Sequence, residues 1–358
     1  MKAKLDENIL ITACSIDPVG FNVIESLRPY FKKLIGVDTN YKPIIKKFVD
    51  KFYLVPLAKD PSYISLILSI AKKNKIKAIF PLTIEECLIL TKNIEILKRN
   101  GIALINENNL NTIKICNDKY KSITFLKKEG LELVPSAHTV KNTYDLKNAA
   151  KFLKYPLKPF IIKPRITHGS RGFKIIKKKY SRFENHLMKK PTDNIYLNIN
   201  ELISIFGEKK YLKFVAMEFL MGKDYSVYGY ARNGEPLYII PMQRLSLLPG
   251  MSLSGLLEKN IEIIEYVSKI IRKLKYNGII NVQLILTKKG PQFYEINPRI
   301  AATTIITKKA GVNLALLATL DALGYKTYAD LLIKKSRITW ETGLYRIHKE
   351  IMFKYEKG

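Results

Sequence analysis

Short apolar runs alternate with amphipathic segments along residues 8–105. A continuous apolar run of about four to eight residues is typical of a strand buried on both faces, and apolar positions at helical spacing predict a helix. Strands and helices in alternation indicate a parallel sheet with right-handed crossovers. The predicted strands are residues 9–14, 34–37, 77–81 and 102–105, and the predicted helices follow Pro18, follow Asp60 and cover residues 84–99.

The pattern changes near residue 115. Asn117 is a helix-capping residue type ahead of a segment with helical spacing, and Gly130 is a helix-ending type, so a helix to about Glu129 is predicted between them. Residues 135–212 are strand-rich, with loops that contain Lys and Pro. The remaining predicted elements are strands within 214–297, one long helix at about 258–274, a helix at 313–323 and two short strands within 338–353.

Two apolar strands late in the chain flank a run of turn-forming residues, which predicts a hairpin. If the hairpin closes symmetrically about Lys289, Gln283 lies opposite Glu295, and Asn297 points to the same face. One carboxylate and two amide oxygens then converge, and such ligands suit Mg²⁺, which leaves its other positions to water and phosphates. The strands are residues 279–286 and 292–297, and the turn is residues 287–291.

Arg299 follows the hairpin within the run Glu295-Ile296-Asn297-Pro298-Arg299. Its planar guanidinium could clamp a phosphoryl oxygen through two hydrogen bonds. The alternative for the whole cluster is an ordinary hairpin with a polar outer face.

A second cluster begins with the apolar strand at residues 160–164, which ends in Lys163-Pro164. The glycine-containing segment 165–172 follows, and its exposed backbone N–H groups suit a flap over phosphates. Lys163 could place a point charge on the α- or β-phosphate. The segment is not a Walker loop, because no Gly-Lys-Ser/Thr opens a helix. An ordinary hairpin turn is the alternative interpretation.

A third cluster lies in residues 215–227, where an apolar strand, a bend at Gly222 and another strand are predicted. Backbone groups around Phe219 and Leu220 could hydrogen-bond an adenine edge, while Asp224 could accept from ribose hydroxyls. The alternative is a core strand followed by a turn.

Composition narrows the class of protein. The chain has 358 residues with 47% hydrophobic and 26% charged residues, which suits two or three domains with buried cores. The 3 cysteines and 4 histidines are scattered and make neither a disulfide framework nor a zinc motif. Apolar stretches stop short of the roughly 20 residues that a membrane helix needs. We therefore expect a cytoplasmic protein with no membrane partner.

The formal net charge of +30 raises the possibility of nucleic-acid binding. Lys outnumbers Arg and is spread along the whole chain, however, and lysine runs such as 177–179 fall at predicted helix ends and turns. The positive charge favours anionic ligands in general, whereas the even spread of the lysines argues against nucleic acid as a specific partner.

The first predicted strand, helix and second strand ending at Asp38 also fit the start of a dinucleotide-binding fold. That fold needs closely spaced glycines in its first turn so that backbone can approach pyrophosphate. Residues 15–20 contain a single glycine, Gly20, so NAD binding is disfavoured. We expect this region to help shape a substrate pocket instead.

Taken in order, Lys119, Lys163-Pro164, the glycine flap, Glu218 to Asp224, Gln283 and the run ending at Arg299 resemble the ATP-grasp superfamily, specifically the branch similar to the carbamoyl-phosphate synthase large subunit. The resemblance implies an α/β and α+β architecture, with an N-terminal Rossmann-like parallel-sheet domain ahead of a two-subdomain ATP-grasp fold. The implied ranges are 1–114 for the N-terminal domain, 115–330 for the ATP-grasp domain with a lid at about 135–212 and a larger catalytic subdomain at about 213–330, and 331–358 for a C-terminal extension.

The resemblance also implies a role for each residue of the three clusters. The implied ATP-binding residues are Lys119 and Lys163 at the phosphates, Gly169, Ser170 and Arg171 in the flap, Glu218, Phe219 and Leu220 at the adenine, and Asp224 at the ribose. The implied metal ligands are Gln283, Glu295 and Asn297, for Mg²⁺ or alternatively Mn²⁺. Arg299 and Lys163 are implied to act in catalysis by steadying the transferred phosphoryl group.

The activity that the resemblance implies is an ATP- and Mg²⁺-dependent ligation of a small-molecule carboxylate to an amine through an acylphosphate, and it is compatible with a homodimer. Two alternatives stay open at this point. One is a non-catalytic ATP-binding regulator, and the other is a basic nucleic-acid-binding protein.

Overall fold

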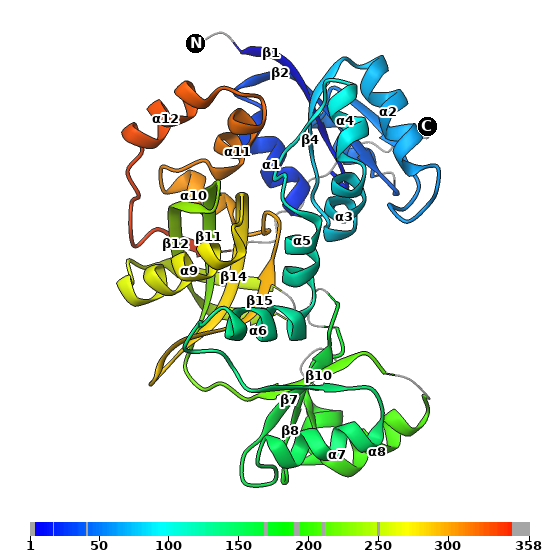
Figure 1. The fold of residues 1–358 in the computed structure, drawn as a ribbon, viewed down its shortest axis with the longest axis vertical. Helices are drawn as coiled ribbons and strands as arrows, with labels where there is room; N and C mark the ends of the chain where they lie inside the picture. The colour runs from blue at the N-terminus through cyan, green and yellow to red at the C-terminus, as the bar shows by residue number, and fades with distance from the viewer. Residues whose placement is uncertain are drawn as a thin grey trace.

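The computed structural model describes residues 4–16, 18–40, 42–167, 171–189, 194–209, 212–248 and 251–345. Within these residues the strands form three sheets, two of five strands and one of six. Figure 1 shows the sheet that contains β7, β8 and β10 at one end of the molecule, joined to the rest near α6. No helix in the described ranges is long and apolar enough to cross a bilayer.

The first sheet is parallel throughout, as the alternating pattern predicts, with the strand order β3-β2-β1-β4-β5. Its strands are β1 (Leu5–Ile11), β2 (Phe31–Asp38), β3 (Lys51–Leu54), β4 (Ile76–Phe80) and β5 (Ala103–Leu104). Its helices are α1 (Val19–Leu27), the short 3₁₀ helix η1 (Pro43–Lys47), α2 (Tyr63–Lys73), α3 (Ile84–Lys92) and α4 (Ile94–Arg99).

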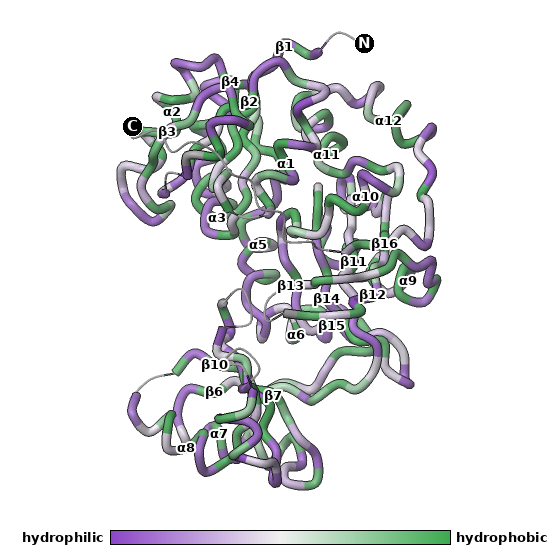
Figure 2. The backbone as a smooth tube through the Cα atoms, turned by 180° about the vertical axis from the view of Figure 1, so that it is seen from behind, coloured by the Kyte–Doolittle hydropathy of each residue, from purple (hydrophilic) through white to green (hydrophobic). Residues whose placement is uncertain are grey.

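Both faces of this sheet are covered. Ile9 and Ile11 of β1 pack in one cluster with α1 and α11 (Leu314–Ala322), and Leu10 packs in a second cluster with α2 and α4. Seven consecutive residues of α11 are buried, and the chain there is coloured mostly hydrophobic in Figure 2. A strand buried on both faces has no polar side to show, which is why its sequence is a continuous apolar run.

Two predicted helices differ from the structure. The predicted helix at 84–99 is two helices, because Asn93 ends α3 and turns its side-chain amide back to the Ile89 carbonyl at 2.9 Å. Asn117 does not cap the next helix. It is the last residue of α5 (Leu110–Asn117), and Asp118 caps α6 (Lys119–Lys128).

The second sheet has the order β6-β10-β7-β8-β9. Its strands are β6 (Ala137–Val140), β7 (Phe160–Pro164), β8 (Lys174–Ile176), β9 (Tyr196–Leu197) and β10 (Phe214–Glu218). Besides strands, the region holds α7 (Thr143–Phe152), the short π-helix η2 (Glu184–Met188) and α8 (Ile199–Gly207), which the strand-rich interpretation missed. β10 lies beyond residue 212, although it pairs with both β6 and β7.

The third sheet has the order β15-β14-β11-β12-β13-β16 and is antiparallel. Its strands are β11 (Lys223–Arg232), β12 (Glu235–Leu248), β13 (Met251–Leu257), β14 (Gly278–Thr287), β15 (Gly290–Asn297) and β16 (Gly343–Tyr345). The helices of this part are α9 (Ile261–Leu274), α10 (Ile305–Lys309), α11 and α12 (Lys326–Lys335). The division of the chain into domains at the predicted residue numbers stays a prediction.

One face of the third sheet is covered by α9. Ile263, Val267 and Ile270 of this helix are fully buried in a cluster with Val282 of β14 and Ile296 of β15. Each such apolar side chain contributes roughly 1.5–3 kcal/mol when buried. Successive side chains of a strand point to opposite faces of the sheet. The residues next to Val282 and Ile296 therefore lie on the face away from α9, and they include the polar residues Gln283, Glu295 and Asn297.

Candidate functional site

Gln283 of β14 lies directly opposite Glu295 of β15, as the sequence predicts. The route to this pairing differs from the predicted one, because Thr287 already pairs with Gly290 and the turn is only two residues long. A register shift between Gln283 and Leu284 leaves Tyr294 as an extra residue on β15. This β-bulge offsets the shorter turn and restores the predicted opposition.

The candidate metal ligands lie on the face of the sheet away from α9. The Glu295 side chain is 21% exposed, and Asn297 is buried, with its side-chain amide 3.4 Å from the Asn281 Oδ1. Among the described residues the Glu295 carboxylate has one ionic partner, Lys119 at 3.7 Å, which leaves its oxygens available. A carboxylate with the amide oxygens of Gln283 and Asn297 fits Mg²⁺, whose remaining ligands are water and phosphate oxygens.

Two buried lysines converge on this carboxylate from different elements. Lys119, at the first turn of α6, donates to the Thr167 carbonyl at 2.9 Å. Lys163, on β7, donates to the Tyr294 carbonyl at 3.0 Å and lies 5.1 Å from the centre of the Tyr294 ring. Burial lowers the pKa of Lys163 to about 8, with a further lowering by Lys119, while Glu295 acts in the opposite sense.

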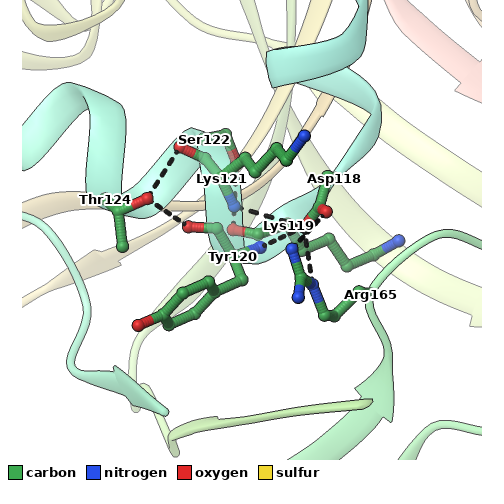
Figure 3. A network of polar contacts seen from close by, with 7 residues as sticks. All are labelled: Asp118, Lys119, Tyr120, Lys121, Ser122, Thr124 and Arg165. Carbon is green, nitrogen blue, oxygen red and sulfur yellow. Dashed lines mark hydrogen bonds and ion pairs between the residues drawn. The ribbon is translucent and has the colours of Figure 1, made fainter. Parts of the chain in front are cut away.

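Asp118 holds both lysine-bearing elements together (Figure 3). Its Oδ1 caps α6 by accepting from the backbone N–H groups of Tyr120 and Lys121 at 3.0 and 3.2 Å. Arg165, two residues beyond Lys163, donates to both Asp118 oxygens at 3.1 and 2.6 Å, and its carbonyl accepts from the Lys119 N–H. A single carboxylate therefore joins the start of α6 to the end of β7.

Arg299 is the third cation near Glu295. Its Nη1 donates to the Ile300 carbonyl at 2.7 Å, and burial lowers its pKa, opposed by Cys87 and Glu295. Cys87 of α3 lies against the Pro298 carbonyl, so α3 borders this end of the site. Two lysines and an arginine against the carboxylates of Glu295 and Glu85 leave a local excess of positive charge, which suits a polyanion.

The residues predicted for adenine and ribose lie at the junction of β10 and β11. Glu218 ends β10, and its carboxylate accepts from the Ser136 N–H at 3.0 Å. Phe219 and Leu220 follow in the connection to β11 and are half-buried. The carboxylate of Asp224, on β11, already has two hydrogen-bond donors, Arg244 at 3.0 Å and the Tyr294 hydroxyl at 3.1 Å.

Two of the predicted flap residues, Gly169 and Ser170, lie outside the described residues. Arg171 is exposed. Gly172 has φ +71°, and a Cβ atom there would come within 2.8 Å of the Pro164 Cδ, so the chain requires glycine at this close approach.

Sequence reasoning missed three residues of this neighbourhood: Asp118, Arg165 and Tyr294. Arg244, which the sequence offers as a candidate for acceptor contacts or as a structural charge, is the partner of Asp224. Asp118 does have a local signal, because Asp directly before a helical segment is a strong N-cap, as is the preceding Asn117. The other two had no local signal, since Tyr294 lies at a bulge that the hydrophobic pattern does not reveal and Arg165 acts through a partner 47 residues away.

Comparison with known families gives two matches. Residues 210–344 match the family described as "ATP-grasp in the biosynthetic pathway with Ter operon", and residues 23–105 match the "PylC-like, N-terminal domain". The carbamoyl phosphate synthase large chain of Thermoplasma acidophilum is 24% identical over 323 residues, which are 87% of this chain and 29% of that relative. The chain thus spans less than a third of the length of the curated relatives it matches.

Solved structures of similar fold include two ligases. The L-amino acid ligase from Bacillus licheniformis has a TM-score of 0.64 at 17% identity, covering 90% of this chain and 75% of that one. N5-carboxyaminoimidazole synthetase from Staphylococcus aureus, in complex with ADP, has a TM-score of 0.65 at 16% identity, covering 90% and 78%. At these identities the likeness establishes the fold.

Proposed function

Because the chain belongs to the ATP-grasp superfamily, in the branch of the carbamoyl-phosphate synthase large subunit, we propose that it is an ATP- and Mg²⁺-dependent ligase that joins a carboxylate to an amine. The fold class predicted from the sequence is confirmed: a parallel-sheet N-terminal part precedes an ATP-grasp fold. The observation that carries the proposal is the convergence of Lys119, Lys163 and Arg299 on Glu295, directly opposite Gln283.

In this proposal Glu295, Gln283 and Asn297 hold Mg²⁺, with Mn²⁺ as an alternative. The ion would neutralise phosphate charge and orient the γ-phosphoryl group. Lys119 and Lys163 bind phosphate oxygens, and Glu218, Phe219 and Leu220 line the adenine site. Asp224 is the proposed ribose contact, and a ribose hydroxyl there would share the carboxylate with Arg244 and Tyr294. The flap of Gly169, Ser170 and Arg171 stays a prediction.

The chemistry proposed for the site starts with an acid substrate whose carboxylate oxygen attacks the γ-phosphorus of ATP. The bond to the β-γ bridging oxygen breaks, and an acylphosphate and ADP form. A neutral amine then attacks the acyl carbon, phosphate leaves, and the amine gives up its proton. Two negative groups have to meet in the first step, so positioning and charge neutralisation matter more than covalent catalysis. Buried lysines and an arginine supply that neutralisation without reorganising during the reaction.

The names of the structural neighbours support the reaction class, because one is an amino acid ligase and another a synthetase with bound ADP. We propose small-molecule carboxylate and amine substrates, a cytoplasmic location and, by analogy, a homodimer. Specific nucleic-acid binding and membrane association are not part of the proposal.

The test is a screen for ADP and phosphate release across pools of small carboxylates and amines with Mg·ATP. Release that needs both an acid and an amine supports the ligase. Tight ATP binding without release under every mixture would favour a non-catalytic nucleotide-binding regulator.

A further inference from the structure

Arg244 of β12 lies on the face of the third sheet that carries Gln283 and Glu295. The pairing Ser226 with Gln283 puts Asp224, two residues from Ser226, on that face, and the Arg244 Nη1 donates to the Asp224 Oδ2 at 3.0 Å. The Arg244 side chain is only 9% exposed. A buried arginine on the face of the proposed catalytic site needs an explanation, since burying a charge is costly.

Three neighbours hold the guanidinium of Arg244 in place. Its Nη1 donates to the Asp224 carboxylate and to the Tyr294 hydroxyl at 2.9 Å, and its Nε donates to the Ser252 Oγ at 2.8 Å. Tyr294 in turn donates its hydroxyl proton to Asp224 at 3.1 Å. Phe293 points into the core, so alternation puts the Tyr294 ring on this face, and the bulge lets Glu295 follow on the same face.

The Nη2 group of Arg244 has no hydrogen-bond partner in the part of the chain that the structure describes. Arg232 of β11, on the same sheet, provides the contrast. Its Nε and Nη2 donate to Asp321 and its Nη1 donates to Asp330, so all three of its nitrogens are paired. Arg232 therefore has the bonding of a structural arginine, whereas Arg244 keeps two N–H donors for another group.

Ser252 of β13 adds a hydroxyl beside Arg244 on this face. It accepts from the Arg244 Nε and is nearly fully buried. Ser246 and its partner Ser254 lie on the other face of the sheet, because Ser254 is adjacent to Gly255, which pairs with Arg244. A fixed guanidinium with a free edge suits a small polar molecule that carries an oxyanion.

We propose that the Nη2 edge of Arg244 binds the carboxylate of the acid substrate. The inference rests on the proposed ligase function and deepens it, because it names the side chain that selects a carboxylate as the substrate. Tyr294 is then a positioning residue, since it fixes Arg244 through its hydroxyl and contacts Lys163 through its carbonyl and ring.

The test measures the melting temperature of the protein with Mg·ADP while small hydroxy acids and amino acids, including glycolate, lactate, glycine and alanine, are added one at a time. Sodium chloride at equal ionic strength is the control. We expect at least one acid to stabilise the wild-type protein beyond chloride. The variant R244Q, which leaves the proposed ribose contact Asp224 in place, should lose that stabilisation and keep the shift caused by Mg·ADP.

Steady-state kinetics with the acid so identified supply the second readout. We expect the KM for the acid to rise ~10-fold or more in R244Q, with a smaller rise in Y294F and with little change in the KM for ATP. R232K is the matched control, and its KM for the acid should equal the wild-type value.

Three outcomes overturn the inference: wild-type protein stabilised by Mg·ADP and by no acid, equal stabilisation of wild type and R244Q by the acid, or a rise confined to the KM for ATP. The last would mean that Arg244 serves the nucleotide. Failure of the proposed function is distinct, because wild-type protein would then show neither a shift with Mg·ADP nor ADP release.

Discussion

Gln283 and Glu295 face each other across β14 and β15 even though the turn between them is tighter than a symmetric hairpin about Lys289 would have. The extra residue at Tyr294 compensates for the shorter turn. Without this compensation Glu295 would lie one position out of register, and a slip of one residue sends a side chain to the other face of a sheet. The bulge therefore keeps the carboxylate on the polar face.

The first prediction concerns Glu295 itself. E295Q preserves shape and removes the one carboxylate among the three candidate metal ligands, so Mg·ATP turnover should fall at least ~100-fold. The measurement is ADP release in the presence of the acid and amine found in the screen. The urea midpoint should stay close to that of wild type, because the carboxylate makes one long ionic contact in the described structure. Substantial turnover by E295Q would remove Glu295 from the site.

The second prediction concerns Asp118, which is nearly fully buried and joins α6 to Arg165. D118A removes a helix cap and leaves a half-buried arginine without its carboxylate, so the free energy of unfolding should fall by roughly 2–3 kcal/mol. Because Lys119 and Lys163 flank this contact, the affinity for ATP should fall as well. Urea unfolding and ATP titration measure the two effects.

D118N separates the two roles of Asp118, since its amide oxygen can still cap α6 while the ionic contact with Arg165 is lost. It should keep about half of the stability that D118A loses, and it should bind ATP more weakly than wild type. If D118A and wild type bound ATP equally well, the contact would be structural and without influence on the lysines.

The third prediction concerns pH. The pKa of Lys163 is lowered from 10.5 to about 8, so its ammonium is charged below that pH and loses its proton above it. The affinity for Mg·ADP should therefore weaken as the pH rises through about 8. The linked effect on folding has the opposite direction: between about 8 and 10.5 the unfolded chain holds more protons, so this lysine makes stability increase with pH.

Calorimetric titration of Mg·ADP from about pH 7 to about pH 9.5 measures this dependence, with K163R as the control that stays charged throughout the range. The wild-type affinity should fall more steeply than that of K163R. Parallel pH profiles would show that Lys163 does not titrate at the nucleotide.

The fourth prediction concerns the net charge of +30. Lysines spread along the chain should bind single- and double-stranded oligonucleotides weakly, without regard to sequence, and with an affinity that falls linearly in log–log plots against salt. Fluorescence anisotropy with two unrelated sequences at two salt concentrations measures this. A clear preference for one sequence that persists at the higher salt would revive the nucleic-acid alternative.

The sequence pattern predicted the elements that depend on interactions between residues close in the chain. The apolar runs of the first sheet are strands because they are buried on both faces, and the Asn313 side chain caps a helix as its residue type suggests. By contrast, α7 was missed because only a narrow stripe of it, Leu146, Ala149 and Ala150, is buried. The break at Asn93 depends on a local hydrogen bond that competes with the helix, and composition alone does not reveal it.

The sequence by itself determined the alternating strands and helices of the parallel first sheet and the hairpin that carries Gln283 and Glu295, because hydrophobic period and turn composition act between near neighbours. Only the tertiary structure decided that Lys119 and Lys163 meet at Glu295, that Asp118 joins them through Arg165, and that the Tyr294 bulge ties Asp224 to Arg244. Those contacts join segments tens to more than a hundred residues apart, and their geometry depends on how three sheets pack, which no short stretch of sequence encodes.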